Sequence, residues 1–372
     1  MVRYYKLLQN PDQDFVKEQL NIILTDDRPE LLEELRKEAD QVRRRWVGDA
    51  VHVRGIIEFS NYCIRNCHYC GLNRSNTRVQ RYRIPPEEIV EIARGAVAMG
   101  FKTIVLQSGD DFYYTREMIA DIVREIKATG AAITLSVGER PTEDYQAWRE
   151  AGADRYLLKF ETSDPELYRQ LHPGTSLAVR LRCLRDLREL GYQVGSGFMI
   201  GLPGQTCEVL AQDLLLMRAL RPEMAGIGPF IPHPATPLSR DSAGDVTLSL
   251  KVLALSRLLL PWAHLPATTA LSSLEKDGRR LGLTGGANVV MPNMTPPAYR
   301  RLYEIYPHKA EVKDSPYNLY QATLDLIREL GREVAGDPGH GLSAEQKSSL
   351  YKEESFYDHC QLYQRAGNMG IA

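Results

Sequence analysis

The sequence has few cysteines, almost no excess of charge and no nucleotide-binding loop. Six cysteines in 372 residues do not make the dense disulfide framework of a small secreted domain. A formal net charge of −2 with 25% charged residues provides no broad basic field for nucleic acid or an anionic membrane. The pattern GxxxxGK followed by Ser or Thr is also absent from the sequence. We therefore expect small-molecule or protein partners, with no nucleic acid and no membrane.

Long apolar runs are also missing. The first residues, MVRYYKLLQNPDQDF, do not resemble a signal peptide. The most apolar stretch, residues 252–262, contains Arg257 and is too short to span a bilayer. We expect a cytoplasmic protein, and in that reducing compartment cysteines serve as metal ligands or buried thiols rather than as disulfides.

Eight short β-branched runs alternate with longer amphipathic stretches. The runs cover residues 52–59, 103–107, 132–137, 155–160, 193–200, 224–228, 265–268 and 287–291. Strands that alternate with crossover helices build a parallel sheet, and eight units in about 240 residues match a closed barrel. We expect an α/β fold with a complete (β/α)8 TIM-type barrel. An open doubly wound sheet is the alternative that this periodicity leaves open.

The same pattern divides the chain into three segments. Helical spacing from residue 14 to residue 45 predicts an N-terminal helical segment over residues 1–48. The barrel is expected over residues 49–310. A C-terminal helical extension over residues 311–372 is expected to pack on the barrel, with an appended helix at 343–366.

Polar or glycine-rich residues follow the first six expected strands. In parallel barrels the active site lies at the carboxyl ends of the strands, on the loops that follow them. The residues at these positions are the cysteines of the loop 61–76, residues 107–110, Glu139, Glu161 with Thr162, residues 201–205 and residues 229–234. We therefore expect an active site at this end of the sheet.

Three cysteines, Cys63, Cys67 and Cys70, follow the first strand with the spacing C-x3-C-x2-C. A structural zinc site takes four ligands, and His68 is the available fourth candidate. A 4Fe-4S cluster takes one thiolate per iron, so three thiolates leave one iron open to bind a substrate. Three buried thiols without a metal are a further alternative. The position of the cysteines on an active-face loop favours the cluster.

This cysteine motif, with Tyr69 just before the last cysteine, resembles the signature of the radical S-adenosylmethionine (SAM) superfamily. The resemblance implies a single 4Fe-4S cluster held by Cys63, Cys67 and Cys70, with SAM bound to the open iron through its amino and carboxylate groups. Reduction then cleaves the sulfonium to methionine and a 5'-deoxyadenosyl radical. The cofactors supply the chemistry, while the protein positions them and excludes water.

The resemblance also implies contacts with SAM. The turn at residues 107–110 falls where such enzymes bind the amino group, Glu161 matches a ribose-binding carboxylate, and Arg180 lies where a basic residue can meet the methionine carboxylate. The run GFMIGLPGQT at 197–206 resembles a motif whose backbone lies along the adenine. The implied cofactor contacts are Tyr69, Gln107, Ser108, Gly109, Thr134, Glu161, Arg180 and Met199.

Longer runs, among them GIGPFIPHPATPL, LPATTAL and GANVVMPNMTPPAYRRLY, resemble the HydE family of FeFe-hydrogenase maturases. The match covers residues 30–310 and is closer than the match to biotin synthase or methylornithine synthase. It implies a substrate such as a cysteine-bound iron carbonyl cyanide complex, an electron donor such as ferredoxin or flavodoxin, and other hydrogenase maturases as partners. The residues implied on the substrate side are Arg155, Met224, Thr268, Thr269 and Tyr306.

Two departures from that family bear on substrate and cluster number. Lys159 and Phe160 stand where the family commonly has Arg and His before Glu161, which removes a fork of donors and a polar ring from this layer. A HydE-like paralogue that acts on an amino acid or a sulfur-containing metabolite therefore stays open. The run PHKAEVKDSPYNLY has no second cysteine set, so we expect one cluster. The remaining cysteines, expected to be buried or incidental, are Cys183, Cys207 and Cys360.

Overall fold

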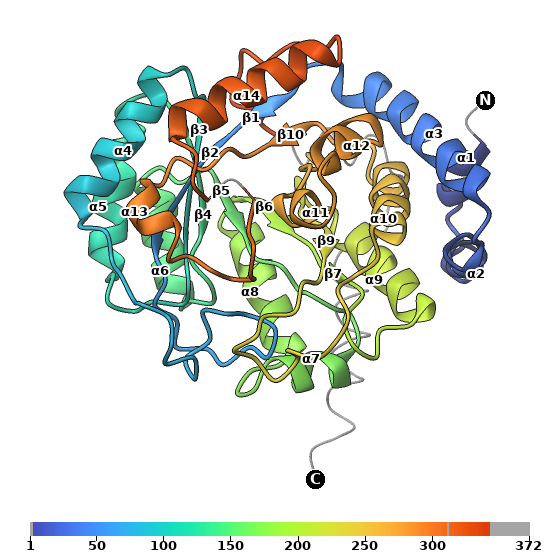
Figure 1. Cartoon of the computed structure of the whole chain (residues 1–372), viewed down its shortest axis with the longest axis horizontal. Coiled ribbons are helices and arrows are strands. Elements are labelled where there is room, and N and C mark those ends of the chain that lie inside the picture. The colour runs from blue at the N-terminus through green and yellow to red at the C-terminus, as the bar shows by residue number, and fades with distance from the viewer. Residues whose placement is uncertain (1–2, 311, 343–372) are drawn as a thin grey trace.

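Six strands form a continuous parallel sheet at the centre of the computed structural model, which describes residues 3–310 and 312–342 (Figure 1). Their order is β2-β3-β4-β5-β6-β8, and each neighbouring pair is parallel. The strands are β2 (Gly55–Ser60), β3 (Thr103–Ser108), β4 (Ala132–Ser136), β5 (Arg155–Leu157), β6 (Gln193–Ser196) and β8 (Met224–Ala225). The predicted α/β fold with a parallel sheet is confirmed.

Two further parallel pairs join β1 (His52–Val53) to β10 (Val289–Val290) and β7 (Met199–Ile200) to β9 (Gly228–Pro229). Single parallel bridges connect Met224 with His264 and Pro266 with Val289. The strand predicted over residues 265–268 is therefore wrong, because Pro266 has no N–H to donate and breaks the ladder.

The expected runs 193–200 and 224–228 each contain two short strands instead of one. The interruption lies where two backbones come very close, since a Cβ on Gly197 would lie 1.8 Å from the carbonyl oxygen of Gly226. Only glycine permits this approach. The chain therefore bends here, and the residues after the bend form the separate pair β7 and β9.

The helices surround the sheet (Figure 1), and their ends follow the signals in the sequence. Pro86 occupies the first turn of α4, and the Thr115 side chain caps α5 by accepting a hydrogen bond from Met118 N. Among the described residues the helices are α1 (Arg3–Leu8), α2 (Gln13–Thr25), α3 (Pro29–Val47), α4 (Pro86–Ala98), α5 (Arg116–Lys127), α6 (Thr142–Glu150), α7 (Pro165–Leu171), α8 (Leu177–Glu189), α9 (Cys207–Leu220), α10 (Val246–Leu259), α11 (Thr269–Leu274), α12 (Gly278–Thr284), α13 (Pro297–Arg300) and α14 (Pro316–Glu329).

Helices flank the sheet at both ends of the described chain. The helical spacing at residues 14–45 corresponds to α2 and α3, which pack against α9 and α10 respectively. After the sheet the chain forms α14, whereas the helix expected at 343–366 lies outside the described residues. Within residues 3–310 and 312–342, the helices do not combine the length and apolar character needed to cross a bilayer.

Alternate residues of each strand face opposite sides of the sheet. In β4, Ile133 and Leu135 belong to the apolar core shared with the helices, whereas Thr134 is buried outside that core. The same alternation in β3 directs Gln107 away from the core. Polar side chains therefore line the inner side of the sheet, and the loops at its carboxyl end lie next to them.

Candidate active site

The three predicted cluster ligands lie on the loop that follows β2, at the carboxyl end of the sheet. Cys63, Cys67 and Cys70 are free thiols of intermediate exposure. The loop is anchored by backbone hydrogen bonds from Ile64 N to Asp110 O, at 3.0 Å, and from His68 N to Leu171 O, at 2.9 Å. The loop after β3 and the end of α7 therefore fix the positions of the cysteines.

The three thiols lie close enough to influence one another. Burial raises the pKa of Cys63 to about 11 and that of Cys70 to about 12. Burial also raises the pKa of Cys67, and the charges of Cys70 and Cys63 raise it further. In the described part of the chain, no three His, Cys, Asp or Glu side chains surround one point as the ligands of a single ion would. Thiolates of a cubane each bind a different iron, and three free thiols that lie near one another supply the donors for three of the four irons.

Gly109 lets the turn after β3 lie directly against the cysteine loop. A Cβ at this position would lie 2.3 Å from the carbonyl oxygen of Tyr62 and 2.7 Å from the Cβ of Cys63. Ser108 Oγ donates to the Gly109 carbonyl at 2.7 Å, and Gln107 Nε2 donates to the Tyr303 hydroxyl at 3.3 Å. The structure therefore places the predicted turn residues beside the cysteine loop.

A buried ionic network links the cysteine loop to the loops after β3 and β4. Arg65 Nε lies 2.7 Å from Asp110 Oδ2, and another nitrogen of Arg65 lies 2.9 Å from Glu139 Oε2. The other oxygen of Glu139 accepts from Arg180 Nε at 2.7 Å. Arg180 also donates to the carbonyl oxygen of Lys159. The network brings Arg180 to the site, and Arg65, which the sequence analysis missed, is its centre.

Tyr69 and Met199, the two residues predicted to contact adenine, lie in one small apolar cluster. Met199 forms this cluster with Leu167, Leu171, Leu202 and Phe230, and Tyr69 packs against it. Burial raises the pKa of Tyr69, and the neighbouring Cys67 and Glu161 raise it further. Tyr69 of the cysteine loop and Met199 of β7, which are far apart in the sequence, therefore meet beside the cysteines.

Glu161 is held in a strained backbone conformation just after the fourth predicted strand, which corresponds to β5. Its φ of 66° lies in a region that favours glycine. Its N–H donates to Gly197 O at 3.0 Å and its carbonyl accepts from Met199 N at 3.0 Å. The carboxylate lies 3.0 Å from Lys159 Nζ, an ion contact without hydrogen-bond geometry, since Oε2 has no hydrogen-bond partner among the described residues. Strain of this kind persists where the surroundings fix a side chain for function.

Thr134 presents an unsatisfied group on the inner side of the sheet. Its side chain is 1% exposed, and its Oγ1 has no hydrogen-bond partner among the described residues. A buried hydroxyl without a partner costs free energy. Thr134 therefore fits a place where a bound amino or hydroxyl group completes the hydrogen bonding.

Phe160 does not face the site. Its ring is fully buried in the apolar core and stacks on Phe198 with a centroid distance of 5.7 Å. The expectation that this residue lies in the same layer as Lys159 and Glu161 is wrong for Phe160, because successive residues of an extended segment point to opposite sides. Of the two residues that depart from the HydE pattern, only Lys159 has its side chain beside the Glu161 carboxylate.

Thr268, Thr269 and Tyr306 lie on segments near the carboxyl ends of the strands. Thr268 caps α11 by accepting from Leu271 N, and Thr269 is the first residue of that helix. A Cβ on Gly228 would lie 2.9 Å from Thr268 Oγ1, so Thr268 lies against β9. The same helix reaches the segment that follows Tyr306, since the Ser273 hydroxyl accepts from the N–H of residue 310 at 3.0 Å.

A basic pocket of about 440 Å³ lies beside this segment. Its lining includes Arg301, Tyr303, His308 and Lys309. Lys309 is paired with the buried Glu58 of β2 and lies over the Tyr303 ring, 5.2 Å from the centroid. Since Tyr303 also bonds Gln107, the pocket lies next to the predicted SAM turn.

Arg155 lies at the opposite end of the sheet from the cysteines. It begins β5, is fully buried, and donates to the carbonyl oxygens of Pro338 at 2.8 Å and Gly339 at 2.9 Å. Arg54 connects Arg155 with Met224. Arg54 donates a hydrogen bond to the Met224 sulfur at 3.0 Å. The pKa of Arg54 is lowered mainly by burial and also by the nearby charge of Arg155.

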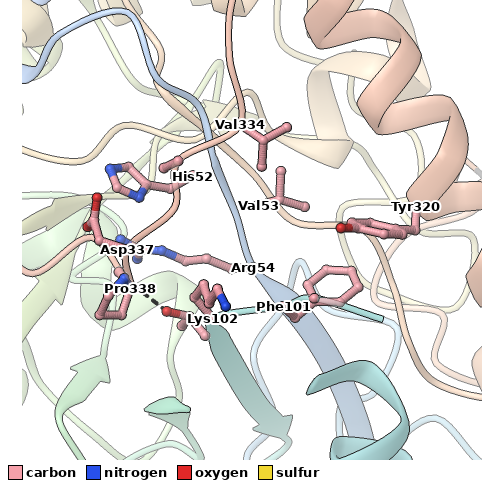
Figure 2. Close-up of a pocket in the computed structure, with 12 residues that line it drawn as sticks. His52, Val53, Arg54, Phe101, Lys102, Tyr320, Val334, Asp337 and Pro338 are labelled. Carbon is pink, nitrogen blue, oxygen red and sulfur yellow. Dashed lines mark hydrogen bonds between the residues drawn. The ribbon is translucent and has the colours of Figure 1, made fainter. Parts of the chain in front are cut away.

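Figure 2 shows the pocket at this end, where His52 and Arg54 lie close to Asp337 and Pro338. The pocket lies between β1, β3 and the segment that follows α14. Arg155 and Met224 are therefore separated along the strands from Thr268, Thr269 and Tyr306. The predicted substrate residues form two groups instead of one.

Three residues of the candidate site escaped the sequence analysis. His172 accepts a hydrogen bond from Tyr69, Arg65 links two carboxylates, and Asp213 is completely buried beside the loop that follows Glu161. Asp213 had a recognisable signal, since it is a lone acid on the apolar side of the helix CEVLAQDLLLMRAL. A buried carboxylate requires hydrogen-bonding partners.

Comparisons with known proteins agree with this geometry. Residues 57–216 match the family model of the radical SAM superfamily. The chain is 52% identical over 327 residues to the FeFe hydrogenase maturase subunit HydE of Thermotoga maritima, covering 88% of this chain and 94% of the relative. It is 33% identical to a 3-methylornithine synthase of Methanosarcina acetivorans, covering 73% and 77% of the two chains.

A solved structure of methylornithine synthase (PylB) superimposes with a TM-score of 0.77 at 29% identity, over 86% of this chain and 94% of that one. The similarity to these proteins is therefore not confined to the cysteine loop. It extends over most of the chain. We conclude that the protein belongs to the radical SAM superfamily and, within it, to the HydE family of FeFe-hydrogenase maturases.

Proposed function

We propose that this chain is a radical SAM enzyme of the HydE type that acts in assembling the dinuclear iron centre of FeFe hydrogenase. The observation that carries the proposal is the set of three mutually close thiols, Cys63, Cys67 and Cys70, on the loop at the carboxyl end of the sheet. When bound, a 4Fe-4S cluster and SAM together supply reductive cleavage of the sulfonium to methionine and a 5'-deoxyadenosyl radical. The chain's own residues bind, orient and shield these groups.

The proposed architecture is a complete (β/α)8 barrel over residues 49–310. It is supported by hydrogen bonds that continue around the sheet beyond β8, from Ala225 N to His264 O and from Ala267 N to Val289 O, both at 2.9 Å. Arg54 N then donates to Val290 O at 3.0 Å. We further propose that residues 1–48 form an N-terminal helical segment and residues 311–372 a C-terminal extension on the barrel.

The SAM site proposed here has a methionine side and a nucleoside side. On the methionine side, Gln107, Ser108 and Gly109 would receive the amino group near Thr134, whose unsatisfied Oγ1 favours this assignment. Arg180 would meet the carboxylate, and Glu139 holds the Arg180 guanidinium in place. These groups are fixed by hydrogen bonds before SAM binds, which lowers the cost of ordering them.

On the nucleoside side, Glu161 would accept hydrogen bonds from the ribose hydroxyls. Tyr69 and Met199 would pack along the adenine, and their shared apolar cluster supports this role. Apolar contacts on this side would keep water away from the reacting carbon, which protects a radical from side reactions.

We propose a small anionic substrate, such as a cysteine-bound iron carbonyl cyanide complex. Thr268, Thr269 and Tyr306 would contact it near the carboxyl ends of the strands, where the pocket beside Lys309 is basic. Arg155 and Met224 would form a second group at the amino end of the sheet and would act on the substrate side from there. The enzyme would work in the cytoplasm with a low-potential donor such as ferredoxin or flavodoxin, together with other hydrogenase maturases.

Lys159 supports a second candidate, a HydE-like paralogue that acts on an amino acid or a sulfur-containing metabolite. Its ammonium lies 3.0 Å from Glu161 Oε2, where the family commonly has a guanidinium. An ammonium is a compact charge without the planar fork that binds two oxygens at once. This difference would alter which substrate the site selects, without removing radical formation.

The test is anaerobic reconstitution with iron and sulfide, followed by reductant and SAM, with chromatographic analysis of the products. Wild-type protein should form 5'-deoxyadenosine, whereas serine variants of Cys63, Cys67 and Cys70 should form none. Cys207→Ser, on α9, is the matched control and should retain formation. Undiminished 5'-deoxyadenosine in all three variants would refute the proposal. Consumption of an added iron carbonyl cyanide complex, rather than of free cysteine or another amino acid, would separate the two candidate functions.

A further inference from the structure

Asp213 is a completely buried carboxylate in the middle of the apolar helix α9. Its exposed fraction is 0%, and the helix residues on both sides of it, among them Leu210 and Leu214, belong to the core. Placing a carboxylate in such surroundings is unfavourable unless donors surround it. The donors around Asp213 therefore show what the residue does.

One oxygen of Asp213 holds the segment that directly follows Glu161. Oδ1 accepts from Ser163 N at 2.5 Å and lies 3.5 Å from Thr162 Oγ1. The strained backbone of Glu161 is thus fixed from both sides. Gly197 and Met199 bond its peptide groups, and Asp213 bonds the residues that come next.

The other oxygen of Asp213 holds the loop that follows Met199, through Gln205. Gln205 Nε2 donates to Asp213 Oδ2 and to Met199 O, both at 2.9 Å. Gln205 Oε1 accepts from Gly201 N at 2.8 Å and from Leu202 N at 3.3 Å. Both hydrogens and the oxygen of the amide are therefore in use, so the orientation of Gln205 is determined.

We propose that Asp213 is a positioning residue that fixes Glu161 relative to Met199, and with them the ribose and adenine contacts of the SAM site. It acts through Ser163 and Gln205, because the donors bound to its carboxylate are protein groups. The inference rests on the proposed function, since it assigns a role within the nucleoside side of that site. The cluster loop, residues 61–76, has its own anchors and is not part of this network.

An amide cannot replace the carboxylate in this network. Burial raises the pKa of Asp213 to about 7, so the comparison is made at pH 8.5, where the carboxylate is ionised and both oxygens accept. In Asp213→Asn one of these oxygens is replaced by a donor, which must face either Ser163 N or Gln205 Nε2. Turning the Gln205 amide does not help, because its nitrogen would then face the N–H groups of Gly201 and Leu202. In each arrangement two buried N–H donors face each other and neither has an acceptor, which costs free energy. We therefore expect the loops carrying Glu161 and Met199 to separate.

The experiment uses the reconstituted holoenzyme and measures binding of two probes. SAM binding is measured by equilibrium dialysis, and binding of methionine alone by the change it causes in the electron paramagnetic resonance spectrum of the reduced cluster. Asp213→Asn should raise the Kd for SAM by about tenfold or more. It should leave iron content and methionine binding within about twofold of wild type, because the hydrogen bonds of Asp213 do not reach the cluster loop or the residues proposed to bind the methionine part of SAM.

Glu223→Gln provides the matched control. Glu223 is also a buried carboxylate that accepts a backbone N–H, that of Val194 at 2.7 Å, but it lies at the amino end of the strands. This control should leave SAM binding unchanged. Gln205→Ala is the second variant, because it breaks the same link from a partly exposed loop position and tests the proposal even where Asp213→Asn fails to fold.

Two results would overturn the positioning role. One is a SAM Kd unchanged in Asp213→Asn and in Gln205→Ala with the cluster intact. The other is an equal weakening of methionine and SAM, which would indicate general damage to the site. Wild-type holoenzyme that binds no SAM would instead refute the proposed function itself, and this outcome is recognisable before any variant is compared.

Discussion

The Tyr69 hydroxyl donates a hydrogen bond to Nε2 of His172 over 2.8 Å. Burial lowers the pKa of His172 to about 3, so the imidazole is neutral near pH 7. Nδ1 lies 3.0 Å from the Tyr168 carbonyl oxygen, and because a carbonyl only accepts, Nδ1 bears the hydrogen. Nε2 is therefore the acceptor. This pair fixes the ring of Tyr69, the residue that directly precedes Cys70 on the cysteine loop.

Replacing Tyr69 by Phe should destabilise the protein by about 1–3 kcal/mol, because the buried Nε2 of His172 loses its donor. The free energy of unfolding, measured by urea denaturation, checks this. Tyr317→Phe is the control, since Tyr317 is 59% exposed, and it should change stability by less than about 0.5 kcal/mol. Equal stability of the two variants would contradict the hydrogen-bond assignment.

Gly109→Ala should disrupt the cysteine loop, because the added Cβ would lie 2.7 Å from the Cβ of Cys63. We expect a large loss of iron bound per chain after reconstitution, measured by a colorimetric iron assay. Gly95→Ala is a matched change within α4, where no atom lies within 4 Å of the added Cβ. It should retain full iron binding and gain roughly 0.5–1 kcal/mol of stability. Full iron loading of Gly109→Ala would show that the loop does not depend on this close approach.

Glu161→Gln should weaken SAM binding while leaving the cluster in place. The substitution keeps the shape but removes the charge that would accept hydrogen bonds from two hydroxyls, and charged acceptors contribute about 1.5–3 kcal/mol. A tenfold or larger rise in the Kd for SAM is expected, since about 1.4 kcal/mol corresponds to a factor of ten. Iron content should stay at the wild-type level. Unchanged SAM affinity would remove Glu161 from the ribose site.

Because of Asp213, the free energy of unfolding should depend on pH in the range between the pKa of this residue in the unfolded chain and its pKa in the folded protein. Burial raises its pKa from 3.8 to about 7, although hydrogen bonds from Ser163, Gln205 and Thr162 lower it. In that interval the folded protein binds a proton that the unfolded chain does not. The associated stabilisation is complete below pH 3.8 and is lost as pH rises through about 7.

The wild-type protein should therefore lose stability relative to Asp213→Asn as pH increases. The difference in free energy of unfolding should shift by at most about 4 kcal/mol over the whole interval. Urea denaturation at a series of pH values from about 5 to 8.5, a range that brackets the folded pKa, measures it. Two curves that stay parallel throughout would show that Asp213 does not titrate in this range.

The sequence predicted the parts of the site that depend on local spacing. The interval between Cys63 and Cys70 indicated a cluster loop, and the positions of Gly109 and Glu161 after two of the expected strands placed both residues at one end of a parallel sheet. Short β-branched runs also predicted the strands of the central sheet, because a parallel strand that is buried on both faces has a nearly continuous apolar sequence.

Features set by distant partners could not be predicted in the same way. The chain near Pro266 forms single bridges instead of a strand, and Phe160 turns toward the core because Phe198 offers it a stacking partner. Arg155 points to the amino end because its carbonyl acceptors come from residues 338 and 339. Local sequence does not specify which partner a side chain meets across such separations.

The carbonyl oxygen of Pro338 lies 183 residues after Arg155 in the chain, yet it accepts a hydrogen bond from that guanidinium. Neighbouring backbone bonds, such as Ala335 N to Val51 O at 2.9 Å, attach this late segment to the start of the first strand. Thr103 and Gln193 also accept from this guanidinium, but its two carbonyl acceptors, at residues 338 and 339, are synthesised long after β5. The Arg155 guanidinium is therefore completely shielded from water only after residues 338 and 339 have docked on the amino end of the sheet.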